Sequence, residues 1–115
     1  MADFVHLHVH TQYSLLDGSS KLGEIVAQAK ALGMDSLAIT DHGVMYGCVK
    51  FYQECKAQGI KPIIGCEVYV APRSRFDKTG AGREGAYTHL VLLCENNEGY
   101  KNLMQLSSLS FTEGF

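Results

Sequence analysis

The sequence lacks the features of several common protein classes. It has no CxxC pair, no excess of basic over acidic residues, and no apolar run near the roughly 18–20 residues that a membrane-spanning helix needs. The net charge of −2 argues against a basic nucleic-acid clamp within this stretch. Residues 1–4 have neither the basic nor the apolar region of a signal peptide. A hydrophobic content of 46% over 115 residues is typical of one globular domain.

The cysteines are few and widely spaced. Closely paired cysteines are typical of disulfide or zinc frameworks, whereas these are predicted to be reduced and mostly buried in a cytosolic protein. Cysteine is also a soft metal ligand, but only Cys66 lies beside another candidate ligand, Glu67. The four are Cys48, Cys55, Cys66 and Cys94.

Hydrophobic periodicity predicts alternating strands and helices. Strands are expected at residues 4–10, 36–40, 61–70 and 88–94, and helices at about 19–32, 46–58 and 97–108. Ser19 or Ser20 is expected to cap the first helix, and Gly33 and Gly59 to end the first two. The inward stripes are predicted to comprise Leu22, Ile25, Val26, Ala29 and Leu32 in the first helix and Val49, Tyr52 and Cys55 in the second.

This order predicts an α/β fold made of parallel βαβ units. Four such units make half of a barrel and leave two open sheet edges. A long surface loop is expected within residues 71–86. We therefore expect residues 1–115 to form the front part of a larger domain that continues beyond Phe115. The alternative is a complete four-stranded α/β sandwich.

The strongest chemical signal is His8-Val9-His10. Alternate residues of a strand point to the same face, so both imidazoles can reach one metal ion. The alternative is a polar sheet face that happens to hold histidines. His6 would lie deeper on the same face, in a structural or hydrogen-bonding role.

A second polar cluster, Thr40-Asp41-His42-Gly43, follows a buried strand directly. The C-terminal ends of strands hold the active sites of α/β folds. His42 is a candidate metal ligand. Asp41 is a candidate catalytic residue that orients a metal-bound imidazole, or else a simple helix cap.

Three further residues have weaker signals on their own. Asp17 precedes Gly18 and is equally compatible with a turn. Glu67 lies in an otherwise apolar strand, where a carboxylate needs a cation or metal. His89 opens its strand instead of closing it, so either that strand runs antiparallel to its neighbours or the predicted boundary is displaced. A mixture of imidazole and carboxylate suits Zn²⁺, Mn²⁺ or Fe, and clustered metals activate water in phosphatases and nucleases.

These motifs resemble a known family. His8-Val9-His10-Thr11, with Tyr13-Ser14 and Asp17-Gly18 behind it, looks like the first motif of the polymerase and histidinol phosphatase (PHP) superfamily. Thr40-Asp41-His42-Gly43 resembles the second motif, and Gly65-Cys66-Glu67 the third. The longer strings at residues 4–11, 59–70, 88–93 and 102–115 resemble the N-terminal PHP domains of bacterial C-family replicative polymerases.

The resemblance implies the first half of a distorted (βα)7, TIM-like PHP barrel with up to three ions of Zn²⁺ or Mn²⁺, with Fe or Mg²⁺ as further options. The implied ligands present here are His8, His10, Asp17, His42, Glu67 and His89. The family's remaining cysteine, aspartate and histidine ligands would lie further along.

The same resemblance implies a metal-dependent phosphoesterase, a 3′–5′ proofreading exonuclease within a DNA-synthesising enzyme. Its implied partners are a DNA 3′ end and other replisome subunits, including a proofreading exonuclease subunit. The alternatives are a free-standing PHP phosphatase, such as one acting on histidinol phosphate, and a metal-binding structural scaffold.

Overall fold

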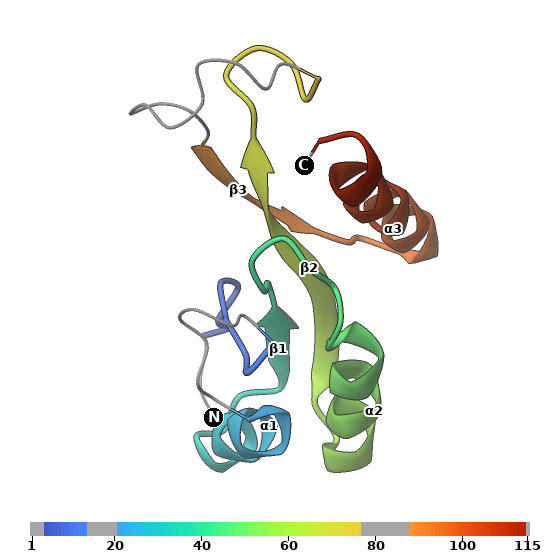
Figure 1. The fold of residues 1–115 in the computed structure, drawn as a ribbon. Coiled ribbons are helices and arrows are strands. Elements are labelled where there is room, and N and C mark those ends of the chain that lie inside the picture. Colours follow the sequence, from blue (N-terminus) through green and yellow to red (C-terminus); the bar gives the residue numbers. More distant parts are fainter. Residues whose placement is uncertain (1–3, 14–20, 77–87, 115) are drawn as a thin grey trace.

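The computed structural model describes residues 4–13, 21–76 and 88–114. The strands form one sheet in the order β1-β2-β3. The long strand β2 joins a part that holds α1, α2 and β1 to a second part that holds β3 and α3 (Figure 1). The elements are α1 (Leu22–Ala31), β1 (Ser36–Ile39), α2 (Cys48–Gln58), β2 (Lys61–Val70), β3 (Thr88–Leu93) and α3 (Asn97–Thr112).

Local signals set most helix ends. Gly33 and Gly59 follow α1 and α2 with φ of 82° and 77°, a conformation that glycine adopts without strain, so both predicted stops are confirmed. At the start of α3 the Asn96 side chain accepts a hydrogen bond of 2.9 Å from the Gly99 N–H. The predicted caps of α1, Ser19 and Ser20, lie outside the described residues, and Lys21 precedes that helix.

The hydrophobic core lies between α1, α2 and β1. It comprises Leu22, Val26, Ala29, Met34, Leu37, Ile39, Cys48, Phe51, Cys55 and Ile60. The inward stripe of α2 is therefore Cys48, Phe51 and Cys55, at helical spacings of three and four. The predictions for Val49, Tyr52 and Leu32 were wrong, since these side chains are 60%, 49% and 55% exposed. Val49 and Tyr52 each follow a buried residue by one position, a rotation of about 100° around the helix.

The sheet is mixed, which corrects the prediction of parallel strands throughout. β1 and β2 are parallel, with Ala38 opposite Ile63. β2 and β3 are antiparallel, with Val68 opposite Leu90. A parallel pair needs a long crossover, usually a helix, whereas the structure has no helix at 71–76. The position of His89 had left two alternatives, an antiparallel strand or a displaced boundary, and the structure has the antiparallel strand.

Residues 4–10 do not form the predicted strand. The segment runs beside β1, where the Ala38 N–H donates to the His6 carbonyl (3.2 Å) and the Thr40 N–H to the Val9 carbonyl (2.9 Å). Between these two hydrogen bonds the chain advances three residues in the first segment, from His6 to Val9, but only two along β1, from Ala38 to Thr40. This offset, like that of a bulge, interrupts the regular ladder.

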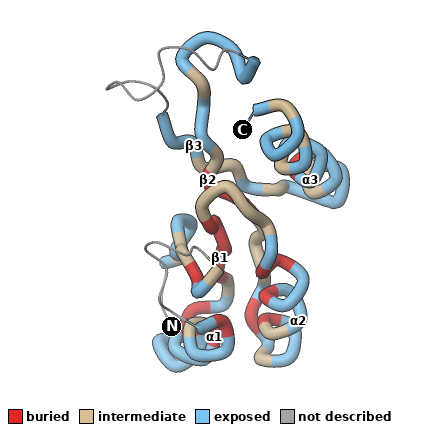
Figure 2. Tube along the Cα trace, in the orientation of Figure 1, coloured by how far each residue is buried: buried red, intermediate tan, exposed pale blue. Residues whose placement is uncertain are grey.

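Burial is concentrated at one end of the molecule (Figure 2). In α3 the only buried side chain among the described residues is Leu103. The radius of gyration is 15.3 Å, against about 13 Å for a compact domain of this length. The described residues include no helix with the length and apolarity needed to cross a membrane.

The prediction that the cysteines are unpaired and mostly buried is confirmed. All four thiols are free, and three of them are buried. Burial raises the pKa of Cys48 to about 12 and that of Cys66 to about 11. Both side chains are therefore neutral thiols near neutral pH.

Candidate metal centre

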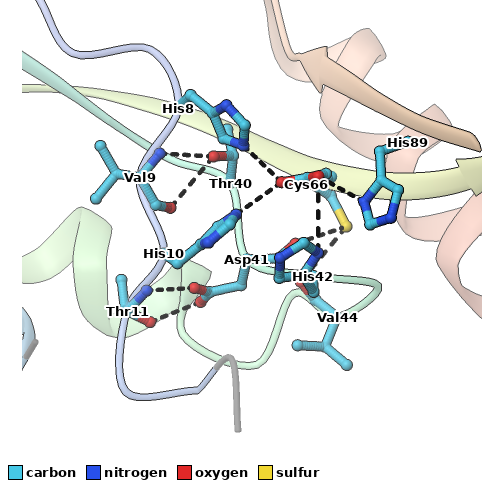
Figure 3. Close-up of polar contacts among 11 residues, drawn as sticks. His8, Val9, His10, Thr11, Thr40, Asp41, His42, Val44, Cys66 and His89 are labelled. Atoms are coloured by element: carbon cyan, nitrogen blue, oxygen red, sulfur yellow. Dashed lines mark hydrogen bonds and ion pairs between the residues drawn. The ribbon is translucent and has the colours of Figure 1, made fainter. Parts of the chain in front are cut away.

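The site is built where the end of β1 meets the middle of β2. Thr40, Asp41 and His42 follow β1 directly, and the His42 backbone forms an isolated parallel bridge with Glu67 of β2. The segment that holds His8 and His10 lies beside this end of β1 (Figure 3). Three stretches that are distant in sequence thus supply side chains to one place.

Glu67 is the centre of the cluster. Its side chain is 6% exposed, and one carboxylate oxygen, Oε1, lies 2.5 Å from His8 Nε2 and 2.7 Å from His10 Nε2. The two imidazole rings are 5.0 Å apart and nearly perpendicular. The prediction that His8 and His10 point to one place agrees with this geometry, although the segment is not a regular strand.

The other carboxylate oxygen of Glu67 faces a second pair of imidazoles. Oε2 lies 2.7 Å from His89 Nδ1 and 3.8 Å from His42 Nδ1, the latter longer than a hydrogen bond. The antiparallel pairing of β3 brings His89 opposite Tyr69, two residues beyond Glu67. The rings of His10 and His42 lie 4.0 Å apart, so the two pairs of imidazoles adjoin.

Opposing effects set the charge of Glu67. Burial alone would raise its pKa, because a charged group loses hydration. Hydrogen bonds with His10, His8 and His89, and the charge of nearby His42, outweigh burial and lower the pKa to about 2. The carboxylate is thus ionised at neutral pH.

The donor atoms fit a metal ion. His8, His10 and Glu67 form one group, and His42, Glu67 and His89 form another, and in each group the ligand atoms lie within 4.8 Å of one another. Imidazole and carboxylate are the ligands of Zn²⁺, Mn²⁺ and Fe sites. Because Glu67 belongs to both groups with different oxygens, it is placed as a bridging carboxylate would be.

Five of the six ligand positions named from the sequence are therefore together. The sixth, Asp17, lies outside the described residues. His6 lies outside both groups and packs its ring 4.7 Å from that of Phe4.

Asp41 is buried and directs both carboxylate oxygens to Thr11, next to His10. Oδ1 accepts a hydrogen bond of 2.5 Å from the Thr11 N–H, and Oδ2 one of 2.6 Å from the Thr11 hydroxyl. The alternative of a helix cap is wrong, because Gly47 precedes α2. That Asp41 orients an imidazole remains a prediction.

Sequence reasoning missed the roles of Thr11, Thr40 and Tyr69. Both threonines are fully buried and hydrogen-bonded to the residues around the histidines. The Tyr69 ring is parallel to that of His42 at 6.0 Å and edge-on to that of His89 at 5.0 Å. Tyr69 lies two residues after Glu67, so the strand period that places Glu67 could have placed it on the same face.

Some known proteins are similar to this chain in sequence, and others are similar in structure. The chain is 54% identical to the DNA polymerase III subunit alpha of Chlamydia pneumoniae, over 97% of this chain and 9% of that protein. It is 56% identical to the corresponding subunit of Treponema pallidum, over 96% of this chain and 10% of that protein. The chain thus spans about a tenth of the length of these curated relatives.

Two solved structures have a similar fold. One, assigned as a metal-dependent phosphoesterase from Bifidobacterium adolescentis, has a TM-score of 0.57 and 25% identity over 76% of this chain and 26% of that one. An amidohydrolase from Chromobacterium violaceum has a TM-score of 0.59 and 24% identity over 88% of this chain and 32% of that one, a likeness of fold alone. The family model described as the PHP domain matches residues 6–115. With nearly its whole length matched, the chain belongs to the PHP domain family.

Proposed function

We propose that this chain is the front part of a PHP domain whose metal site hydrolyses phosphodiester bonds at a DNA 3′ end. The observation that carries the proposal is the Glu67 carboxylate, which has an imidazole pair on each of its two oxygens. The names of the relatives support a place within the alpha subunit of a bacterial DNA polymerase III. We propose that the domain, a distorted (βα)7 barrel, continues beyond Phe115.

The site would hold Zn²⁺ or Mn²⁺, with Fe or Mg²⁺ as further options and up to three ions in the complete domain. His8, His10 and Glu67 would bind one ion, and His42, Glu67 and His89 a second. Asp17 would be a further ligand. An ion bound here would supply the Lewis acidity that activates water and stabilises charge on a phosphoryl group.

The chain's own residues support hydrolysis by water. Covalent catalysis needs an activated nucleophile beside a base. The thiol nearest the site, Cys66, has a pKa raised by burial to about 11 and donates to the Asp41 and Val44 carbonyls at 3.5 Å. Glu67 stays ionised and holds the imidazoles of His8, His10 and His89 by hydrogen bonds, and Asp41 orients neighbouring groups without attacking phosphate.

The whole protein's activity would be DNA-directed DNA synthesis, a nucleotidyl transfer carried out by a later domain. In that protein the proposed partners are the DNA 3′ end and other replisome subunits, including a proofreading exonuclease subunit. Such a replication enzyme would work in the cytoplasm. These proposals rest on the relatives' names, because the chain covers only about a tenth of each relative.

The first prediction tests metal binding in the full-length protein. Elemental analysis should find at least one Zn, Mn or Fe ion per chain, and a double variant, His8→Ala with His10→Ala, should lose most of it. His6→Ala is the matched control, because His6 is on the same segment but outside both ligand groups. Unchanged metal content in the double variant would refute the assignment.

Nucleotide release from a labelled DNA 3′ end, with and without chelator, tests the reaction. We expect release from the wild type and the control, and its loss on chelation and in the double variant. Release that survives thorough chelation contradicts the mechanism. Hydrolysis of only a small phosphomonoester would instead favour a phosphatase, and bound metal without hydrolysis a scaffold.

A further inference from the structure

The Thr40 side chain makes a pair of hydrogen bonds with one backbone residue. Its hydroxyl accepts from the Val9 N–H at 2.8 Å and donates to the Val9 carbonyl at 3.2 Å (Figure 3). Val9 stands between His8 and His10, and Thr40 is fully buried at the end of β1. One hydroxyl thus fixes the backbone between two candidate ligands.

Thr11 makes a second contact of this kind on the other side of His10. Its N–H and hydroxyl both donate to the Asp41 carboxylate, at 2.5 and 2.6 Å. Thr11 is fully buried as well, and its oxygen also accepts from the Tyr13 N–H at 3.2 Å. The two neighbours of His10 in the chain, Val9 and Thr11, are therefore both held by side chains that directly follow β1, those of Thr40 and Asp41.

The irregular pairing of this segment explains why side chains are needed. A regular strand would be held by a ladder of backbone hydrogen bonds. Here the ladder is interrupted, because three residues of this segment lie beside two residues of β1. A side chain, the Thr40 hydroxyl, therefore provides the acceptor for the Val9 N–H. A backbone N–H that lacked an acceptor in such a place would destabilise this conformation.

We propose that Thr40 and Thr11 are positioning residues of the metal centre. Their hydroxyls hold His8 and His10 with both Nε2 atoms at Glu67 Oε1 before a metal arrives. Ligands held in advance bind a metal more tightly, because less ordering accompanies binding. The inference rests on the proposed function, namely that this cluster binds metal.

The test uses Thr40→Val, which keeps the side-chain shape and removes the hydroxyl, and Thr40→Ser, which keeps the hydroxyl. Co²⁺ is titrated into the metal-free full-length protein, and affinity is measured together with the visible absorption spectrum, which reports ligand geometry. We expect Thr40→Val to weaken Co²⁺ binding by roughly 10–100-fold and to change the spectrum, as the loss of outer hydrogen bonds to a metal site does. Thr40→Ser should restore both.

The matched control is Thr112→Val, which removes a hydroxyl that also donates to a backbone carbonyl, that of Ser108, but in α3. It should leave affinity and spectrum unchanged. A Thr40→Val protein that binds Co²⁺ as the wild type does, with the same spectrum, overturns the inference and leaves the proposed function standing. A wild type that binds no Co²⁺ overturns both.

Thermal unfolding in chelator shows whether Thr40→Val folds. If it does not, Thr11→Val decides, since it removes the hydroxyl contacts to Asp41 and to the Tyr13 N–H and keeps the contact between the Thr11 N–H and Asp41. Weaker Co²⁺ binding in a folded Thr11→Val protein supports the proposal, and unchanged binding overturns it.

Discussion

Glu67 shows how one residue can hold a site together. It is buried in the middle of β2, where an isolated carboxylate would be unfavourable, and its two oxygens face four imidazoles. These neighbours more than offset burial and keep its pKa near 2, below the ordinary value of 4.5. The same side chain that would bridge two ions therefore also stabilises the fold without metal.

This pKa predicts how stability of the metal-free protein depends on pH. A carboxyl group whose pKa is lower in the folded than in the unfolded state stabilises the fold above the unfolded value. The contribution of Glu67 should therefore be complete above about pH 4.5 and be lost as pH falls towards about 2. Glu67→Gln lacks this contribution, so its urea midpoint should lie furthest below that of the wild type above pH 4.5.

Urea unfolding of both proteins in chelator, from neutral to acid pH, measures this difference. Glu98→Gln is the control, since Glu98 is an exposed glutamate in the first turn of α3. It should follow the wild-type curve. A gap between wild type and Glu67→Gln that stays constant down to pH 2 would contradict the prediction.

At the scale of elements, local signals were enough for β1, β2 and β3 and for the ends of α1 and α2, but not for residues 4–10 or for the end of α3. The predicted bounds of β2, residues 61–70, agree with the structure, and Gly59 ends α2 because glycine adopts a positive φ without strain. Pairing was harder. The offset of residues 4–10 and the direction of β3 depend on contacts between distant segments, which no local pattern encodes.

The residues of the site could likewise be predicted from local signals, whereas their arrangement in space could not. Histidines and acids could be named because each is unusual in an apolar strand or at a strand end. Their convergence on one carboxylate depends on the antiparallel turn-back of β3, which brings in His89. Thr11 and Thr40 were missed, because threonine is equally common on surfaces and gives no signal of burial by itself.

Close packing of the strands leaves no room for a side chain at Gly65 of β2. A Cβ atom there would lie 2.5 Å from the Leu92 carbonyl oxygen and 3.2 Å from that of Ile39. Both are backbone atoms of the neighbouring strands, so the sheet itself would have to shift. We predict that Gly65→Ala destabilises the protein by at least about 1–3 kcal/mol, the usual range for overpacking.

Gly23→Ala is the matched control in chemical denaturation. Gly23 lies within α1, where an added Cβ would meet, among the described residues, only the Glu54 side chain at 3.7 Å, an ordinary contact. Alanine favours a helix over glycine by roughly 0.5–1 kcal/mol, so this variant should be slightly more stable. Equal midpoints for the two variants would show that β2 has more room than its geometry indicates.

At the scale of the whole molecule, the main hydrophobic core lies in one part of the protein. The buried residues gather around α1, α2 and β1, whereas the part with β3 and α3 is mostly exposed (Figure 2). Among the described strands β3 lies at the edge of the sheet, and such an edge favours pairing with another chain. The large exposed apolar residues of β3, α3 and the adjoining end of β2 are Tyr69, Val70, Leu90, Leu93, Met104, Leu106 and Phe111.

We therefore predict that the 115-residue chain self-associates through this part. Sedimentation velocity at tens of micromolar, a concentration at which weak contacts of about 6–7 kcal/mol still register, should show species larger than a monomer.

Met104→Glu with Phe111→Glu places two charges seven residues apart on one face of α3 and should shift the protein towards monomer. Leu32→Glu adds a charge at an equally exposed position of the other part and should leave association unchanged. A wild type that sediments as a compact monomer would contradict the prediction. Association that the double variant retains would place the contact away from α3, at the edge of β3.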